Sequence, residues 1–145
     1  MFAPNLRYQK SLEYYISFWE RLNRRSVSLL SSLADAGVAF QDPYHAVHGV
    51  QDMEKILERR LSCCERLSVR ISDFAWSQHE GRGYMFWDMS YSSKKREGFK
   101  KIDFKARVSG VSEVLFNKDG QVAAHQEFWG GHTDFDVGRY LALND

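Results

Sequence analysis

The stretch that decides the fold is GVAFQDPYHAVHG, from Gly37 to Gly49. It predicts a short strand over residues 38–41, followed by Asp42-Pro43 and a loop. Pro43 disfavours a helical backbone at Asp42 and keeps that residue extended. The carboxylate of Asp42 is therefore predicted to stand at the end of a strand, and the apolar spacing on both sides predicts flanking helices.

Length and composition indicate a single globular domain. The chain has 145 residues, and we predict one domain over residues 1–145, with a core over about 8–130 and a tail over 131–145. Hydrophobic residues make up 43% of the chain and aromatic residues 14%, which suffices for a large apolar interior. The net charge of +1 argues against a nucleic-acid partner held by bulk charge.

Three sequence features bear on where the protein resides. The N-terminal sequence MFAPNLRYQK lacks the apolar run of a signal peptide. No apolar segment approaches the roughly 20 residues of a membrane span. The adjacent Cys63 and Cys64 are predicted to be reduced thiols, because neighbouring cysteines rarely pair with each other. We therefore expect a soluble, cytoplasmic protein without a membrane partner.

Apolar residues recur at three- and four-residue spacing in the first half of the chain. This spacing predicts helices over residues 8–24, 27–34 and 50–63. The inward stripe of the third helix consists of Val50, Met53, Ile56, Leu57 and Arg60 or Leu61.

From residue 65 the apolar period changes to two, which predicts strands. Four strands are predicted, over residues 65–77, 84–93, 102–116 and 122–129. Gly130-Gly131 is expected to end the last strand, and a short helix is expected around 137–143. Helices followed by a meander of strands predict an α+β fold with the helices on one face of an antiparallel sheet.

Four motifs in this order resemble the SnoaL-like branch of the nuclear transport factor 2-like superfamily, which is related to ketosteroid isomerases and polyketide cyclases. They are VAFQDPYHAVHG, MFWDMSY, VLFNKDGQVAAH and EFW, and the resemblance covers roughly residues 10–130. The resemblance implies a cone-shaped, curved antiparallel sheet wrapped around the helices, with a deep apolar pocket inside. It also implies a homodimer formed through the outer face of the sheet.

The ketosteroid isomerase pattern matches this chain at one position and departs at two. The general base of that pattern falls on Asp42, whose pKa we expect burial to raise. The oxyanion tyrosine falls on Phe18, which cannot donate a hydrogen bond, and the second donor falls near Ser112. Tyr14 or Tyr15, one turn earlier on the first helix, offers a substitute donor. Steroid isomerisation is therefore not the predicted activity.

The SnoaL-like cyclases place acid/base groups on the last strands. In this chain alternation puts His125, Glu127 and Trp129 on one face of the last strand, although the acid that many relatives carry after the tryptophan is replaced by Gly130. Asp42 or His125 is thus the candidate base, with Glu127 orienting the imidazole. The alternative is structural: these groups bond one another, and Asp42 accepts backbone N–H bonds from the following loop.

Aromatic and sulfur-containing side chains are candidates for a ligand-binding wall. An apolar stripe is also typical of plain core, and in a cone-shaped sheet the two interpretations overlap. The predicted ligand-binding residues are Tyr15, Phe18, Trp19, Tyr44, Trp87, Met89, Tyr91, Ser112 and Trp129.

Three histidines near Asp42 raise the question of a metal site. His45 and His48 are spaced as H-x-x-H, but they lie in a predicted loop, and neither His132 nor the cysteine pair forms a second cluster with zinc spacing. We predict no metal and no cofactor.

Two functional hypotheses follow. In the first, the chain performs acid/base catalysis without a cofactor on an aromatic or polycyclic substrate: isomerisation, cyclisation, dehydration or hydrolysis. In the second, it is a non-catalytic module that binds a small apolar or aromatic molecule in the pocket or a protein on the sheet. The oxyanion donor missing at Phe18 weighs against the first.

Overall fold

The computed structural model describes residues 5–97 and 100–132, with side-chain environments described outside 93–104 and 131–132. The helix expected around residues 137–143 therefore lies outside the described residues. The elements in chain order are η1 Leu6–Tyr8, α1 Gln9–Glu20, η2 Val27–Leu29, α2 Leu30–Leu33, β1 Ala34–Gln41, β2 Ala46–His48, α3 Val50–Ser62, β3 Arg66–Trp76, β4 Arg82–Glu97, β5 Lys100–Phe116 and β6 Val122–His132.

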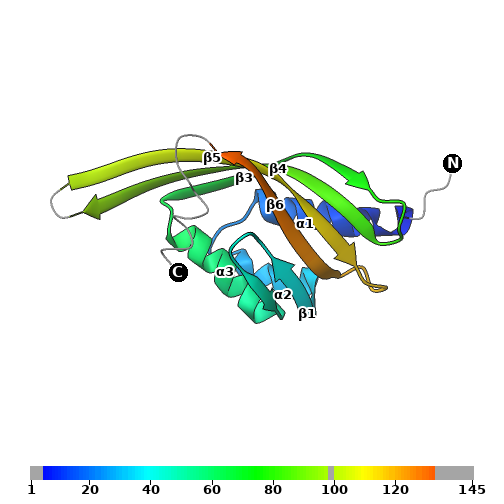
Figure 1. Cartoon of the computed structure of the whole chain (residues 1–145). Coiled ribbons are helices and arrows are strands. Elements are labelled where there is room, and N and C mark those ends of the chain that lie inside the picture. Colours follow the sequence, from blue (N-terminus) through cyan, green and yellow to red (C-terminus); the bar gives the residue numbers. More distant parts are fainter. Residues whose placement is uncertain (1–4, 98–99, 133–145) are drawn as a thin grey trace.

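The strands form one curved sheet in the order β2-β1-β6-β5-β4-β3. Figure 1 shows the helices gathered on one side of this sheet, and α1 packs on β3 while α3 packs on β1. The expected α+β fold is confirmed. The sheet is mixed rather than wholly antiparallel, because β1 runs parallel to β6.

Several boundaries differ from those predicted, and β1 begins at Ala34, inside the predicted second helix, rather than at residue 38. The loop after Pro43 contains the short strand β2, since the turn closed by the Asp42 N–H to His45 carbonyl bond (3.0 Å) brings the chain back along β1. The first helix ends at Glu20, earlier than expected. Strands β4 and β6 run past the predicted ends, and β6 continues through Gly130-Gly131 because β5 still pairs with it at His132.

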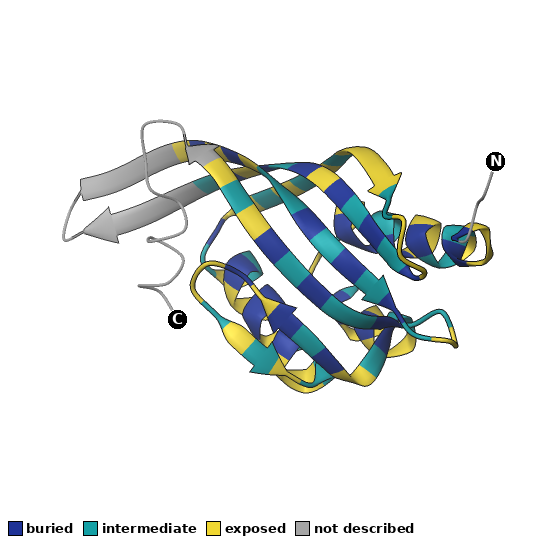
Figure 2. Cartoon of the chain, turned by 45° about the vertical axis from the view of Figure 1, so that its right-hand side comes forward, coloured by how far each residue is buried: buried dark blue, intermediate teal, exposed yellow. Residues whose placement is uncertain are grey.

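The core fills the space between the helices and the inner face of the sheet. Figure 2 shows buried and exposed residues alternating along the strands, as the period of two predicted. One buried cluster joins α1 and α3 to β1, β5 and β6, and a second joins Cys64 to the inner faces of β4 and β5. Several polar side chains are as deeply buried as the apolar ones in these clusters. They include Asp42, Arg60, Ser112, His125 and Glu127.

Candidate functional site

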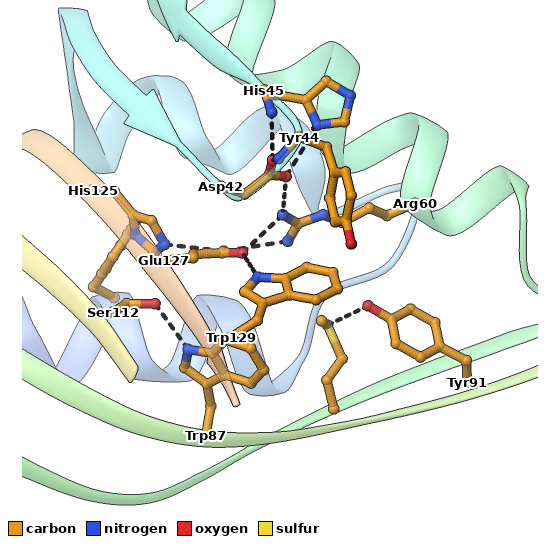
Figure 3. A network of polar contacts seen from close by, with 12 residues as sticks. Asp42, Tyr44, His45, Arg60, Trp87, Tyr91, Ser112, His125, Glu127 and Trp129 are labelled. Atoms are coloured by element: carbon orange, nitrogen blue, oxygen red, sulfur yellow. Dashed lines mark hydrogen bonds and ion pairs between the residues drawn. The ribbon is translucent and has the colours of Figure 1, made fainter. Parts of the chain in front are cut away.

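The centre of the buried polar cluster is Arg60 on α3. The inward face of this helix consists of Met53, Ile56, Leu57 and Arg60. A guanidinium therefore lies where an apolar side chain would be expected, and only 4% of the surface of Arg60 is exposed. Its Nη2 donates to Asp42 Oδ2 at 2.7 Å and to Glu127 Oε1 at 2.8 Å, and its Nη1 donates to Glu127 Oε2 at 3.2 Å. Arg60 therefore bridges the two predicted catalytic carboxylates (Figure 3).

Asp42 anchors the turn between β1 and β2. Its Oδ1 accepts the backbone N–H groups of Tyr44 at 2.8 Å and His45 at 2.7 Å, and His45 Nδ1 lies 3.0 Å from the same oxygen. Together with Arg60, these donors surround the carboxylate. Asp42 thus accepts backbone N–H bonds from the following loop, as the structural alternative to a catalytic role predicted. These bonds leave few acceptor positions on the carboxylate for a substrate.

His125 is held through both ring nitrogens. Its Nε2 lies 3.1 Å from Glu127 Oε2, and its Nδ1 lies 2.7 Å from the hydroxyl of Tyr15. Because a carboxylate only accepts, we assign the proton of Nε2 to the bond with Glu127, and a neutral ring then accepts from Tyr15. The imidazole also contacts the rings of Phe40 and Trp19, with centroids 5.3 and 5.1 Å away.

The charged groups of this cluster shift one another's pKa values. Burial alone would raise the pKa of Glu127, but Arg60 and then His125 outweigh it and hold that pKa well below its ordinary range. Burial alone would lower the pKa of Arg60, but the nearby acidic groups, Glu127 first, keep it above its ordinary value. Glu127 is therefore a stable anion and a weak base.

A small enclosed cavity lies beside the polar cluster, with a volume of about 10 Å³. This is room for about one water molecule. Its wall is polar on one side and apolar on the other, and it comprises Trp19, Arg60, Val69, Ile71, Met85, Trp87, Met89, Ser112, His125 and Glu127. Trp87 Nε1 donates to Ser112 Oγ at 2.9 Å, whereas Trp19 Nε1 is buried without a partner among the described residues.

Trp129 covers the carboxylate of Glu127. Its Nε1 donates to Glu127 Oε1 at 3.0 Å, and its ring meets Trp87 edge to face at 6.1 Å and half-exposed Tyr44 at 5.9 Å. The guanidinium of Arg60 lies 5.7 Å from the same ring. Trp129 does not line the cavity itself, but it packs against three residues that do, namely Glu127, Trp87 and Arg60.

The remaining predicted residues divide between the site and other surfaces. Tyr15 reaches the cluster through His125, whereas Tyr14 points to solvent. Phe18 is buried and lines a separate groove between α1 and the segment that contains α2, and it is not among the residues that line the cavity beside Arg60. Tyr91 lies near the cluster, and its hydroxyl donates to Met89 Sδ at 3.0 Å (Figure 3).

Arg60 is the functional candidate that the sequence analysis did not name. The available signal was its position, since an arginine in the inward stripe of an amphipathic helix must find buried anionic partners. His48 is exposed and does not join the site. Among the side chains that the structure describes, histidine, cysteine and acidic groups form no cluster able to hold a metal ion, and no helix in the described part of the chain could span a membrane.

No protein-family model matches the sequence, and no curated protein matches it. Solved structures do match. An NTF2-like protein of unknown function from Exiguobacterium sp. 255-15 is 14% identical, with a TM-score of 0.66 over 83% of this chain and 98% of that one. A candidate SnoaL-like polyketide cyclase from Jannaschia sp. CCS1 is 12% identical, with a TM-score of 0.66 over 89% of each chain.

A steroid delta-isomerase from Pseudomonas aeruginosa is 14% identical, with a TM-score of 0.63 over 97% of this chain and 89% of that one. These likenesses define the class: the chain has the nuclear transport factor 2-like fold. The resemblance to SnoaL-like proteins is confirmed at the level of that fold. Because this fold carries unrelated activities, the function must be argued from the site.

Proposed function

We propose that this chain binds a small apolar or aromatic molecule on the concave side of the sheet, between the tryptophan and methionine wall and the Arg60 cluster. One observation carries the proposal: a fully hydrogen-bonded polar cluster forms one wall of a cavity that is otherwise apolar. A few convergent polar groups in an apolar enclosure are typical of ligand sites.

Stability alone is a poor reason for this cluster. A buried ion pair is often no more stabilising than apolar side chains of the same volume, because desolvation offsets the attraction. Two carboxylates, a guanidinium and a histidine at one place in the core therefore favour a role in binding or catalysis.

Ligand binding requires the cavity to enlarge, because a volume of about 10 Å³ cannot hold an aromatic ring. We propose that Trp129, which packs against the lining residues Glu127 and Trp87, moves to make this room. The indole is attached by one hydrogen bond to Glu127 and by edge contacts to Trp87 and Tyr44. Loss of these few contacts is a modest cost that a bound aromatic molecule can replace.

The test is a binding screen with steroids, aromatic polyketides and flavonoids, read by tryptophan fluorescence and by thermal shift. We expect Trp129→Ala to bind at least one of these compounds more tightly than wild type, since the opening cost is removed. Phe74→Ala, at an exposed position of β3 that does not line the cavity, is the matched control and should bind as wild type does. If neither wild type nor Trp129→Ala binds any compound, the binding proposal is wrong.

A second candidate function is acid/base catalysis on the bound molecule, without a cofactor. It is favoured by the position of His125, which lines the cavity between Glu127 and the hydroxyl of Tyr15. Because both ring nitrogens are hydrogen-bonded, proton exchange with a substrate would require the bond to Tyr15 or to Glu127 to open. The reaction classes are isomerisation, cyclisation, dehydration and hydrolysis. For any compound that binds, His125→Gln should retain binding and lose turnover; turnover unchanged in this variant would exclude the imidazole as the acid/base group.

We further propose a homodimer through the outer face of the sheet. Phe86 and Phe128 are exposed there, and cross-strand pairing places Val111 between them. Such an apolar row suits a contact between two copies. Light scattering after size exclusion should give twice the chain mass for wild type and the single mass for Phe86→Glu. A wild-type monomer would contradict this.

A further inference from the structure

A groove of about 250 Å³ runs between the two N-terminal helical segments. It shares no lining residue with the cavity beside Arg60. One wall follows a single face of α1 and its C-cap residue, and it consists of Tyr14, Ser17, Phe18 and Arg21. The other wall comes from the segment that contains η2 and α2 and consists of Ser26, Leu29, Ser32 and Leu33.

Large apolar side chains stand at the rim of this groove. Tyr14 is 64% exposed and Leu29 is 57% exposed, while Phe18 and Leu33 form a more buried floor. An exposed tyrosine and leucine on opposite walls of one groove form an apolar surface that a partner would cover. Burial of this surface is favourable by about 25 cal/mol per Å² of apolar area.

One arginine lines the groove, and two more lie in the turn that connects its two walls. The first is Arg21, and the others are Arg24 and Arg25 between α1 and η2, all exposed. No carboxylate lines the groove, and within the part of the chain that the structure describes none pairs with these three guanidinium groups. These charges are therefore available to an anionic partner.

The two walls are held in place by a hydrogen-bonded turn. Asn23 Oδ1 accepts the backbone N–H groups of Arg25 at 2.8 Å and Ser26 at 3.0 Å, and Ser26 Oγ accepts the N–H of Asn23 at 2.9 Å. Because the groove is formed before any partner arrives, little conformational entropy is lost on binding.

We propose that this groove binds an amphipathic helical segment of a partner protein that carries large apolar side chains on one face and carboxylates at one end. The apolar side chains would meet Tyr14 and Leu29, as in other helix-in-groove contacts, and the carboxylates would meet the arginine cluster. The proposal does not depend on a ligand in the concave site.

The test begins with a phage-displayed library of random peptides selected on the full chain. The expected consensus combines spaced leucine or aromatic residues with terminal Asp or Glu. A labelled consensus peptide is then titrated by fluorescence anisotropy, and its affinity should fall as salt rises. No enrichment, or a consensus without carboxylates, overturns the proposal.

Variants locate the peptide on the protein. Leu29→Asp and the double variant Arg21→Glu/Arg24→Glu should each weaken binding by at least about tenfold. Leu6→Asp, which is exposed outside the groove, should bind as wild type does. Unchanged binding by Leu29→Asp overturns the proposal. Co-sedimentation with phosphatidylglycerol vesicles that Leu29→Asp abolishes would assign the groove to a membrane surface and overturn it as well.

Discussion

At the scale of single residues, the candidate site depends on Arg60. Its guanidinium is the one described cation within hydrogen-bond distance of both Asp42 and Glu127. Without it, two carboxylates would remain buried close together in a largely apolar core. The cost of leaving a buried charge unpaired exceeds the net worth of the pair itself.

Arg60→Leu should therefore lower the free energy of unfolding by about 3–5 kcal/mol, because it strands Asp42 and Glu127. Arg60→Lys should lie between this variant and wild type, since an ammonium cannot bridge both carboxylates as the planar guanidinium does. The measurement is urea unfolding at neutral pH.

Arg59→Leu is the matched control, because Arg59 lies on the exposed face of the same helix. It should change the unfolding free energy by no more than about 0.5 kcal/mol. Equal effects at the two positions would contradict the bridging role of Arg60.

At the scale of elements, the long strand β5 shapes the apolar wall of the site through Gly110. A Cβ at this position would lie 2.6 Å from Trp87 Cη2 and would also collide with the carbonyl oxygen of Phe128 on β6. The absent side chain lets the indole of Trp87 lie across β5 and donate to Ser112. A glycine in the strand interior is explained by this close approach.

Gly110→Ala is expected to destabilise the chain by about 1–3 kcal/mol through overpacking. It should also change tryptophan fluorescence and near-ultraviolet circular dichroism, because Trp87 must move. Gly37→Ala on β1 is the control: its Cβ would meet Asp35 Oδ1 at 3.5 Å, an ordinary contact. Wild-type spectra and stability for Gly110→Ala would refute this account of the wall.

At the scale of the whole molecule, the cluster couples the stability of the fold to pH. It joins β1, α3, β6 and α1 through Asp42, Arg60, Glu127, His125 and Tyr15, so its ionisation affects every layer of the structure. Glu127 has a folded-state pKa below its ordinary value of 4.5. Its contribution to stability is therefore full above about pH 4.5 and is lost as the pH falls further and the unfolded chain binds the proton first.

We expect the unfolding free energy of wild type to decrease below pH 4.5, with Glu127 contributing a slope of up to about 1.4 kcal/mol per pH unit. Glu127→Gln should be less stable than wild type at pH 7 and should lack this part of the slope. Glu58→Gln, on the exposed face of α3, serves as the control. Chemical denaturation at several pH values provides the measurement, and parallel profiles for wild type and Glu127→Gln would disprove the coupling.

The sequence by itself determined the types and order of the helices and of every described strand except β2, which was predicted as a loop. Apolar spacing of three to four residues identified the helices, and the period of two identified the inward faces of β4, β5 and β6. It also placed Asp42 at a strand end and put His125 and Glu127 on one face of a strand. These are local properties of the backbone, so they can be read from neighbouring residues.

The tertiary structure alone decided which side chains meet. Arg60 is 67 positions from Glu127, and Tyr15 is 110 positions from His125. No local pattern encodes these separations, because they follow from how α3 and α1 pack on the sheet. The same packing placed Phe18 on the outer groove and left a cavity of about 10 Å³ beside Arg60. The volume of a cavity depends on how every surrounding side chain fills space, which no single stretch of the sequence contains.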